Sequence, residues 1–188
     1  MKKSVKIILS IILICILLYV INVVRNIFIL KDIQDKSSKL SELNDFSYTL
    51  NTDDLKHVLT KKGNIIKVEE YEDNKIMYFN TETDEAIEED METGEKTYYQ
   101  LAPTGAYMPI YNSENTNIYK LAFKSIILSS KLDDKKCYKI INSNNTSFVE
   151  KEQALLLKTI DKDEITTNYT NYKLDNIDNI EFNKVRLY

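Results

Sequence analysis

Glycine is scarce in this chain, with 3 residues among 188, and this scarcity excludes several familiar nucleotide sites. P-loops and dinucleotide-binding loops need closely spaced glycines, because their backbone must approach the phosphate groups without intervening side chains. Neither pattern occurs in the sequence, and the G-x-S-x-G motif of α/β-hydrolases is missing as well. We therefore expect the protein to use no cofactor.

Cysteine and histidine are rarer still, with two residues and one residue. Cys15 lies inside an apolar run, far along the chain from Cys137, so the pair cannot form a framework disulfide. His57 alone cannot build a histidine-rich metal site, and no ordered spacing of nucleophile and base surrounds it. We expect no metal site, no catalytic residue and no enzymatic activity.

Basic residues dominate only at the N-terminus. Residues 1–30 contain Lys2, Lys3, Lys6 and Arg25 and no acidic residue, so the total charge of −4 leaves −8 for residues 31–188. Nucleic acids and anionic lipid head groups both attract basic surfaces. The acidic remainder therefore opposes a nucleic-acid partner and flat docking on anionic lipid.

Acidic side chains concentrate in residues 82–92, where seven of eleven residues are Asp or Glu. A calcium-binding loop would need the D-x-[DN]-x-[DN]-G spacing with its glycine turn, which this segment lacks. Alternation along a strand would also send these carboxylates to both faces of a sheet. We interpret the segment as a solvated sheet edge that resists aggregation.

One long hydrophobic run is present, because residues 7–24 contain no charged side chain. Eighteen residues reach the lower limit of a bilayer span, and the apolar residues 27–30 extend it past Arg25. A cleaved signal peptide needs small residues before the cut, yet no alanine precedes Ala86. Ile14 stands before Cys15 where a lipoprotein signal has a small residue, so we favour an uncleaved anchor over residues 1–30.

The basic residues predict how this anchor is oriented. Lys2, Lys3 and Lys6 closely flank its N-terminal end, and Arg25 alone lies near the other end. Because basic residues are retained in the cytoplasm, we expect a single-pass protein of the cell membrane with a cytoplasmic N-terminus and an extracytoplasmic C-terminal domain.

The remaining chain divides into a short helical segment and a strand-rich domain. In residues 31–45, apolar Ile33, Leu40 and Leu43 recur at helical intervals, which predicts a stalk or the first helix of the domain. Residues 46–188 form the predicted extracytoplasmic β domain, and we expect residues 31–188 to fold alone as a soluble monomer.

Alternating segments separated by turn residues predict strands over residues 64–71, 75–80, 85–90 and 95–101, and again over 137–142, 146–152, 154–161, 164–174 and 180–188. Short turns between them require antiparallel pairing. Between these two groups, residues 118–132 have apolar positions at three- and four-residue steps and predict one amphipathic helix. The expected fold is α+β and mainly β: a curved antiparallel sheet, or half-barrel, with one or two helices on one face.

Two stretches resemble the lipoprotein-carrier (LolA-like) superfamily. They are residues 159–188 (TIDKDEITTNYTNYKLDNIDNIEFNKVRLY) and the pairing of YFN with GEKTYY in the earlier strands. The resemblance covers roughly residues 40–188 by architecture, although Asp163, Glu164 and Ile165 stand where the family usually has a Gly-Leu-Pro-like turn. It implies a half-barrel around an apolar groove with a helical lid, which in some members holds acyl chains, and it implies no catalysis.

Apolar and aromatic residues in an irregular segment mark where such a groove would open. This segment, residues 107–111, contains both aromatic and aliphatic side chains just before the predicted helix, and groove mouths are commonly built from such loops. The alternative is that these side chains fill the core. The groove candidates are Tyr107, Met108, Ile110, Tyr111, Leu121 and Phe123.

Two functional hypotheses follow. The first is a membrane-anchored, extracytoplasmic, non-enzymatic binding domain that carries or senses a lipid, a lipoprotein or another apolar ligand of the cell envelope. The second is a protein–protein interaction or regulatory ectodomain of an envelope complex, with no ligand cavity. A pocket lined by apolar side chains favours the first hypothesis, and a filled core with a free edge strand favours the second.

Overall fold

The computed structural model describes residues 2–53, 55–100, 108–111, 117–175, 177–180 and 182. Its two helices are α1 (Lys2–Ser41) and α2 (Ile118–Lys124). The eleven strands are β1 (Phe46–Asn51), β2 (Lys56–Lys62), β3 (Ile65–Glu70), β4 (Lys75–Asn80), β5 (Glu85–Asp90), β6 (Lys96–Gln100), β7 (Ile126–Leu132), β8 (Lys135–Ile141), β9 (Asn145–Glu150), β10 (Leu156–Asp161) and β11 (Thr166–Leu174).

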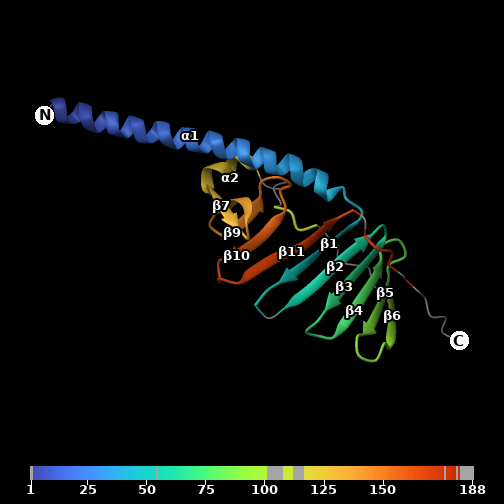
Figure 1. Ribbon diagram of the computed structural model, residues 1–188. Helices are drawn as coiled ribbons and strands as arrows, with labels where there is room; N and C mark the ends of the chain where they lie inside the picture. The colour runs from blue at the N-terminus through green and yellow to red at the C-terminus, as the bar shows by residue number, and fades with distance from the viewer. Residues whose placement is uncertain are drawn as a thin grey trace.

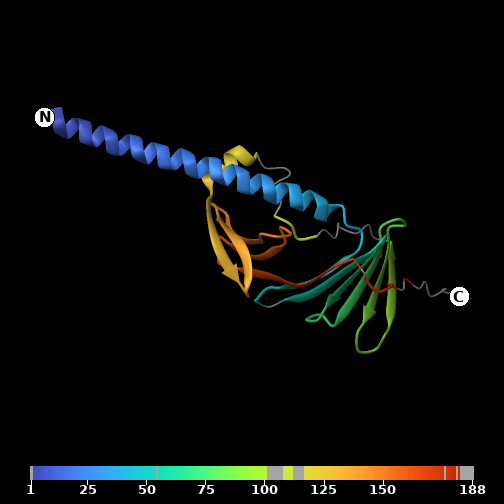
Figure 2. The same cartoon turned by 45° about the horizontal axis from the view of Figure 1, so that its top comes forward.

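All eleven strands form one open antiparallel sheet in the order β6-β5-β4-β3-β2-β1-β11-β10-β9-β8-β7. Each half is a meander of neighbouring hairpins, and the two halves join where β1 pairs with β11. Left-handed residues make the tight turns possible: Asn74 (φ 54°) and Gly94 (φ 71°) lie between successive strands of the first half. The prediction of a mainly β, α+β fold with an antiparallel sheet is confirmed, and the sheet curves beneath α1 without closing (Figures 1 and 2).

Helix α1 is one uninterrupted element of 40 residues, so the hydrophobic run and the segment after it share a single axis. Within it, residues 5–41 are long and apolar enough, by length and composition, to cross a membrane. Nearly all of the run projects away from the sheet (Figure 1). Its side chains are exposed except for Val23. From Val23 onward one stripe becomes buried against the domain, at Val23, Asn26, Leu30, Ile33, Ser37 and Leu40.

The core lies between this stripe and the sheet, in two clusters. The first cluster joins Val23, Leu30 and Ile33 of α1 to the second half of the sheet, including Ile127, Ile140 and Val149. The second joins Leu40 to β1 and β10 through Phe46, Tyr48, Met108, Cys137, Leu155 and Leu157. The end of α1 therefore belongs to the domain core.

The helix predicted over residues 118–132 is wrong in its second half. Ser125 takes an extended conformation (φ −111°, ψ 147°) and ends α2, and residues 126–132 form the edge strand β7. The β-branched pair Ile126 and Ile127 favours a strand, and pairing of Ile127 with Ile140 places it in the core. The apolar residues of 126–132 fit both the helical period and the alternation of a strand. Pairing with β8 selects the strand.

The structure differs from the predicted strands at three further places. Strands β1 and β2 were not predicted, and β2 contains His57, which pairs with Leu50 of β1 and Glu70 of β3. The strand predicted over residues 180–188 is absent at Ile180 and Phe182. Residue 181 and residues 183–188 lie outside the described part of the chain.

Candidate functional site

A groove of about 670 Å³ opens between α2 and the β8–β9 hairpin. Its lining combines apolar side chains with two lysines and several asparagine, serine and threonine side chains. We call it the α2 groove. Its lining comprises Ile110, Tyr111, Asn117, Lys120, Leu121, Lys124, residues 142–145, Ser147, Leu156 and Thr159.

Contacts at both of its ends hold α2, one wall of this groove, in place. At the N-terminal end, the Asn117 side chain accepts a hydrogen bond from the Lys120 backbone N–H at 3.1 Å and caps the helix. At the other end, Asn26 Nδ2 of α1 donates to the backbone oxygens of Ala122 (3.2 Å) and Ser125 (3.1 Å). Carbonyls at a helix C-terminus lack intrahelical donors. The buried Asn26 side chain therefore provides a hydrogen-bond donor for two of these carbonyls.

The backbone of residues 108–111, which includes Ile110 and Tyr111 of the lining, is hydrogen-bonded to the sheet. Ile110 forms an isolated antiparallel bridge with Leu155, and Pro109 O accepts a hydrogen bond from the Leu156 N–H at 3.4 Å. Burial raises the pKa of the Tyr111 hydroxyl, and a hydrogen bond with the Asn142 side chain acts in the opposite direction. These contacts fix this part of the lining against β10.

The opposite wall is a turn built from asparagines. Asn142 Oδ1 accepts hydrogen bonds from the Asn144 N–H (2.8 Å) and the Asn145 N–H (3.0 Å), and Asn142 Nδ2 donates to Asn145 Oδ1 (2.9 Å). Such side-chain contacts stabilise a tight turn. The asparagines and serine of this segment indicate a turn, and no local pattern in the sequence places it beside residues 110, 111 and 117–121.

The six predicted groove residues separate in space. Ile110, Tyr111 and Leu121 line the α2 groove together. Met108 is buried in the second core cluster, and Phe123 lies on the exposed side of α2 against Tyr19 of α1, with ring centroids 6.4 Å apart. Tyr107 lies outside the described residues.

A smaller cavity of about 420 Å³ lies on the other face of the sheet, where the described residues 177–180 pass over β1–β6. Several of its polar side chains are engaged with one another or with neighbouring residues. Ser47 Oγ and Thr60 Oγ1 share a hydrogen bond at 3.1 Å, and Lys96 pairs with Glu89 at 3.3 Å. Burial, aided by Glu89, raises the pKa of Tyr78 to about 12.

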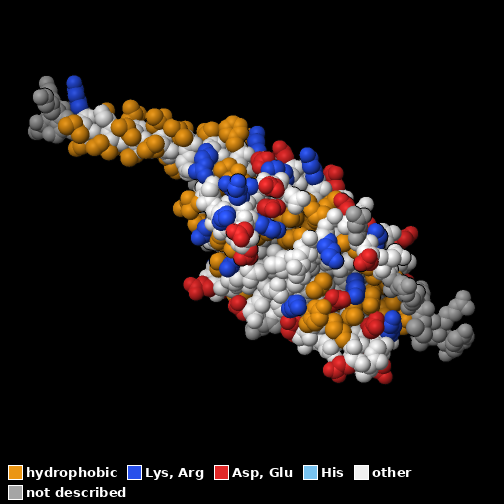
Figure 3. All heavy atoms as spheres, in the orientation of Figure 1, with side chains coloured by type: hydrophobic (Ala, Val, Ile, Leu, Met, Phe, Trp, Pro, Cys, Tyr) orange, Lys and Arg blue, Asp and Glu red, His pale blue; other side chains and the backbone are white. Residues whose placement is uncertain are grey.

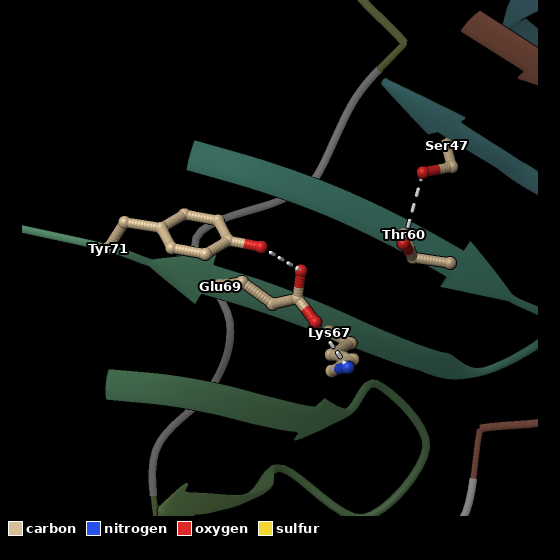
Figure 4. A network of polar contacts seen from close by, with 5 residues as sticks. All are labelled: Ser47, Thr60, Lys67, Glu69 and Tyr71. Carbon is tan, nitrogen blue, oxygen red and sulfur yellow. Dashed lines mark hydrogen bonds and ion pairs between the residues drawn. The ribbon is translucent and has the colours of Figure 1, made fainter. Parts of the chain in front are cut away.

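The close view of this face shows how its charges pair (Figure 4). Glu69 receives Lys67 Nζ on one carboxylate oxygen at 2.5 Å and the Tyr71 hydroxyl on the other at 3.2 Å. A lysine that is paired with a carboxylate attracts an anionic ligand only weakly, because the two charges neutralise each other. The cavity is therefore a weaker candidate site than the α2 groove.

The acidic segment of residues 82–92 is held by lysines and a turn. Glu88 pairs with Lys75 at 3.2 Å. Asp90 accepts hydrogen bonds from the backbone and side chain of Thr93, which lower the pKa of its carboxyl group. In the described ranges, no three His, Cys, Asp or Glu side chains are grouped to hold a metal ion.

Comparison with known proteins adds little to this geometry. No protein-family model matches the sequence, and no curated protein matches it. A structure of PNGF-II aligns with 73% of this chain and 28% of its own, at 11% identity and a TM-score of 0.30. A DUF1329 family protein from Desulfovibrio piger ATCC 29098 aligns with 79% of this chain and 93% of its own, at 9% identity and a TM-score of 0.28.

The chain therefore spans less than a third of the PNGF-II chain that it matches. Both TM-scores lie below 0.5, so neither similarity carries an argument about function. The likeness to the lipoprotein-carrier superfamily stays a weak resemblance in architecture.

Proposed function

We propose that this protein is a membrane-anchored, non-enzymatic binding domain, and that the α2 groove receives an anionic amphiphile such as a fatty acid or a lipid with an acidic head group. The observation that carries the proposal is the groove itself. Its lining combines apolar side chains with two lysines, and one of its walls packs against the apolar N-terminal helix.

The anchoring role of α1 is supported by the surface of its first half. The consecutive side chains Ile7, Ile8 and Leu9 point to different sides of the helix, and all three are more than half exposed. A helix that is apolar all round requires either a protein core or a membrane around it. Only 6% of its most apolar window is buried, so the hydrocarbon of a bilayer is the environment that matches.

The preference for an anionic amphiphile comes from the lining of the groove. Ile110, Leu121 and Leu156 offer apolar surface that favours an acyl chain by about 25 cal/mol per Å² buried. Lys120 and Lys124 are exposed one turn apart on α2, beside the groove. An ammonium group is a compact point charge that pairs with a carboxylate or a phosphate.

Photocrosslinking tests this function. The full chain is reconstituted with an anionic fatty acid that carries a photoreactive group on its chain, and the adducts are mapped by mass spectrometry. We expect adducts at the groove lining and their loss in Leu121→Asp, which places a carboxylate among the apolar side chains of the lining. Ile165→Asp is the matched control, because Ile165 is exposed in the turn before β11 and lies outside the groove.

Adducts confined to the first half of α1, with none in the groove, would contradict the proposal. In that case the second candidate, an interaction module, gains support. The specific observation in its favour is that the two core clusters fill the space between α1 and the sheet, while β6 and β7 end the described sheet as edge strands. Exposed edges are templates for pairing with a strand of another protein.

A further inference from the structure

Beside α1, the domain presents an exposed apolar patch, which we call the apolar foot. It consists of four large side chains at the start of the second half of the sheet. Their exposed fractions are 56% for Tyr119, 57% for Phe123, 58% for Ile126 and 46% for Leu128. Scattered apolar side chains are ordinary on a protein surface. These four are close in the chain: Tyr119 and Phe123 lie one turn apart on α2, and Ile126 and Leu128 lie at the start of β7 on the face opposite the core residue Ile127.

Three contacts place the apolar foot alongside one short stretch of α1. The ring of Phe123 lies 6.4 Å from that of Tyr19. Asn26 holds the C-terminal end of α2, and Arg25 Nη2 donates to the backbone oxygen of Ile127 at 3.3 Å. The foot is therefore level with residues 19–26 along the helix axis.

The length of the apolar run fixes where that stretch lies in a bilayer. At 1.5 Å per residue the eighteen residues of the run span about 27 Å, against a hydrocarbon core of about 30 Å. The run has no residues to spare, so its last turn cannot stand clear of the membrane. Residues 19–26 therefore extend from the outer part of the hydrocarbon to the head groups, and α2 lies beside this stretch.

The chemistry of the surrounding side chains matches that boundary. Aromatic residues are enriched at the membrane interface, where Tyr119 and Phe123 would lie. Lys120 and Lys124 directly follow Tyr119 and Phe123 in the chain, and Arg25 contacts the start of β7. Long basic side chains reach from such a position to the head groups. Figure 3 shows the apolar surface of α1 running up to basic side chains at the near end of the domain. This local basic charge contrasts with the net −8 of residues 31–188.

We infer that the apolar foot inserts into the interface of the same bilayer that α1 crosses, so that the domain rests on the membrane in one fixed orientation. The partner is the lipid leaflet on the side of the domain. This inference rests on the proposed anchoring by α1. It gives the α2 groove, which shares α2 with the foot, a position at the membrane surface.

The absence of tryptophan permits a direct test, because any introduced tryptophan is the only one in the chain. The full chain is reconstituted into phosphatidylcholine and phosphatidylglycerol vesicles, with or without lipids brominated on their acyl chains. Three variants are compared: Phe123→Trp in the foot, Tyr19→Trp in α1 and Tyr99→Trp on β6. Tyr119→Trp is a second foot variant should Phe123→Trp fail to fold.

We expect brominated lipid to remove most of the fluorescence of Phe123→Trp and Tyr19→Trp and to leave Tyr99→Trp unchanged. Tyr99 is also an exposed aromatic residue, but it lies at the far end of the sheet order. Quenching of Tyr19→Trp without quenching of either foot variant would overturn the inference and leave the anchor intact. An unquenched Tyr19→Trp would instead overturn the anchor itself.

Discussion

At the scale of single residues, Asn26 connects the two parts of the protein. Asn26 and Ser37 are the two polar residues in the described buried stripe of α1, and Asn26 is fully buried. Its amide group donates to two backbone oxygens at the end of α2. A polar residue near the end of an apolar run thus has a structural role in joining helix and domain.

Asn26→Ala should therefore destabilise the protein by about 1–3 kcal/mol, because the two carbonyls of α2 would remain buried without their donor. Asn22→Ala is the matched control, since Asn22 lies one turn earlier on the same helix and is exposed. The measurement is chemical unfolding of both variants in mild detergent, followed by circular dichroism. Equal stability of the two variants would show that Asn26 does not hold α2.

At the scale of elements, α1 is shared between the apolar run and the domain. Its buried residues are spaced three or four apart from Val23 to Leu40, which forms one stripe along the helix. The boundary expected after residue 30 therefore falls within the part of α1 that packs on the sheet. Val23 and Leu30 both belong to the first core cluster.

A fragment of residues 23–188 should be more stable than a fragment of residues 31–188. The shorter fragment lacks Val23 and Leu30, and burial of two such aliphatic side chains contributes about 3–6 kcal/mol. Urea unfolding of the two fragments, monitored by circular dichroism, measures the difference. Coincident transitions would mean that the first turns of the buried stripe contribute nothing to the fold.

The sequence predicted those elements whose signals are local. Hairpins around Asn74 and Gly94 were predicted because turn residues separate alternating segments. Strand β2 was missed because its sequence, KHVLTKK, has three lysines and little alternation, and its partners on both sides decide its structure. The end of α2 was missed because the apolar residues of 126–132 fit both the helical period and the alternation of a strand.

The candidate site was predictable to a similar extent. Ile110 and Tyr111 stood out as apolar residues in an irregular segment, and Leu121 as part of an amphipathic helix. Leu156 and the asparagine turn of residues 142–145 complete the groove from strands more than twenty residues away. No local pattern in a single sequence indicates which distant segments meet.

At the scale of the whole molecule, one straight helix carries an apolar half and a half that is part of the core. The domain begins where the apolar half ends, with α2 alongside the junction (Figure 2). Such an arrangement allows little movement between anchor and domain. In the proposed account the protein is a binding domain held at the membrane surface, with the groove beside the point of insertion.

Thiol labelling in intact cells tests this account most directly. The unsubstituted chain is a suitable blank, because Cys137 is fully buried and Cys15 lies in the apolar run. Lys162→Cys places an exposed thiol in the turn between β10 and β11, and Ser4→Cys places one before the apolar run.

The account predicts that a membrane-impermeant maleimide labels Lys162→Cys in intact cells and labels Ser4→Cys only after permeabilisation. It also predicts that both variants stay with the membrane after alkaline washing. Release of the chain by alkali, or protection of Lys162→Cys in intact cells, would contradict the anchored, extracytoplasmic domain.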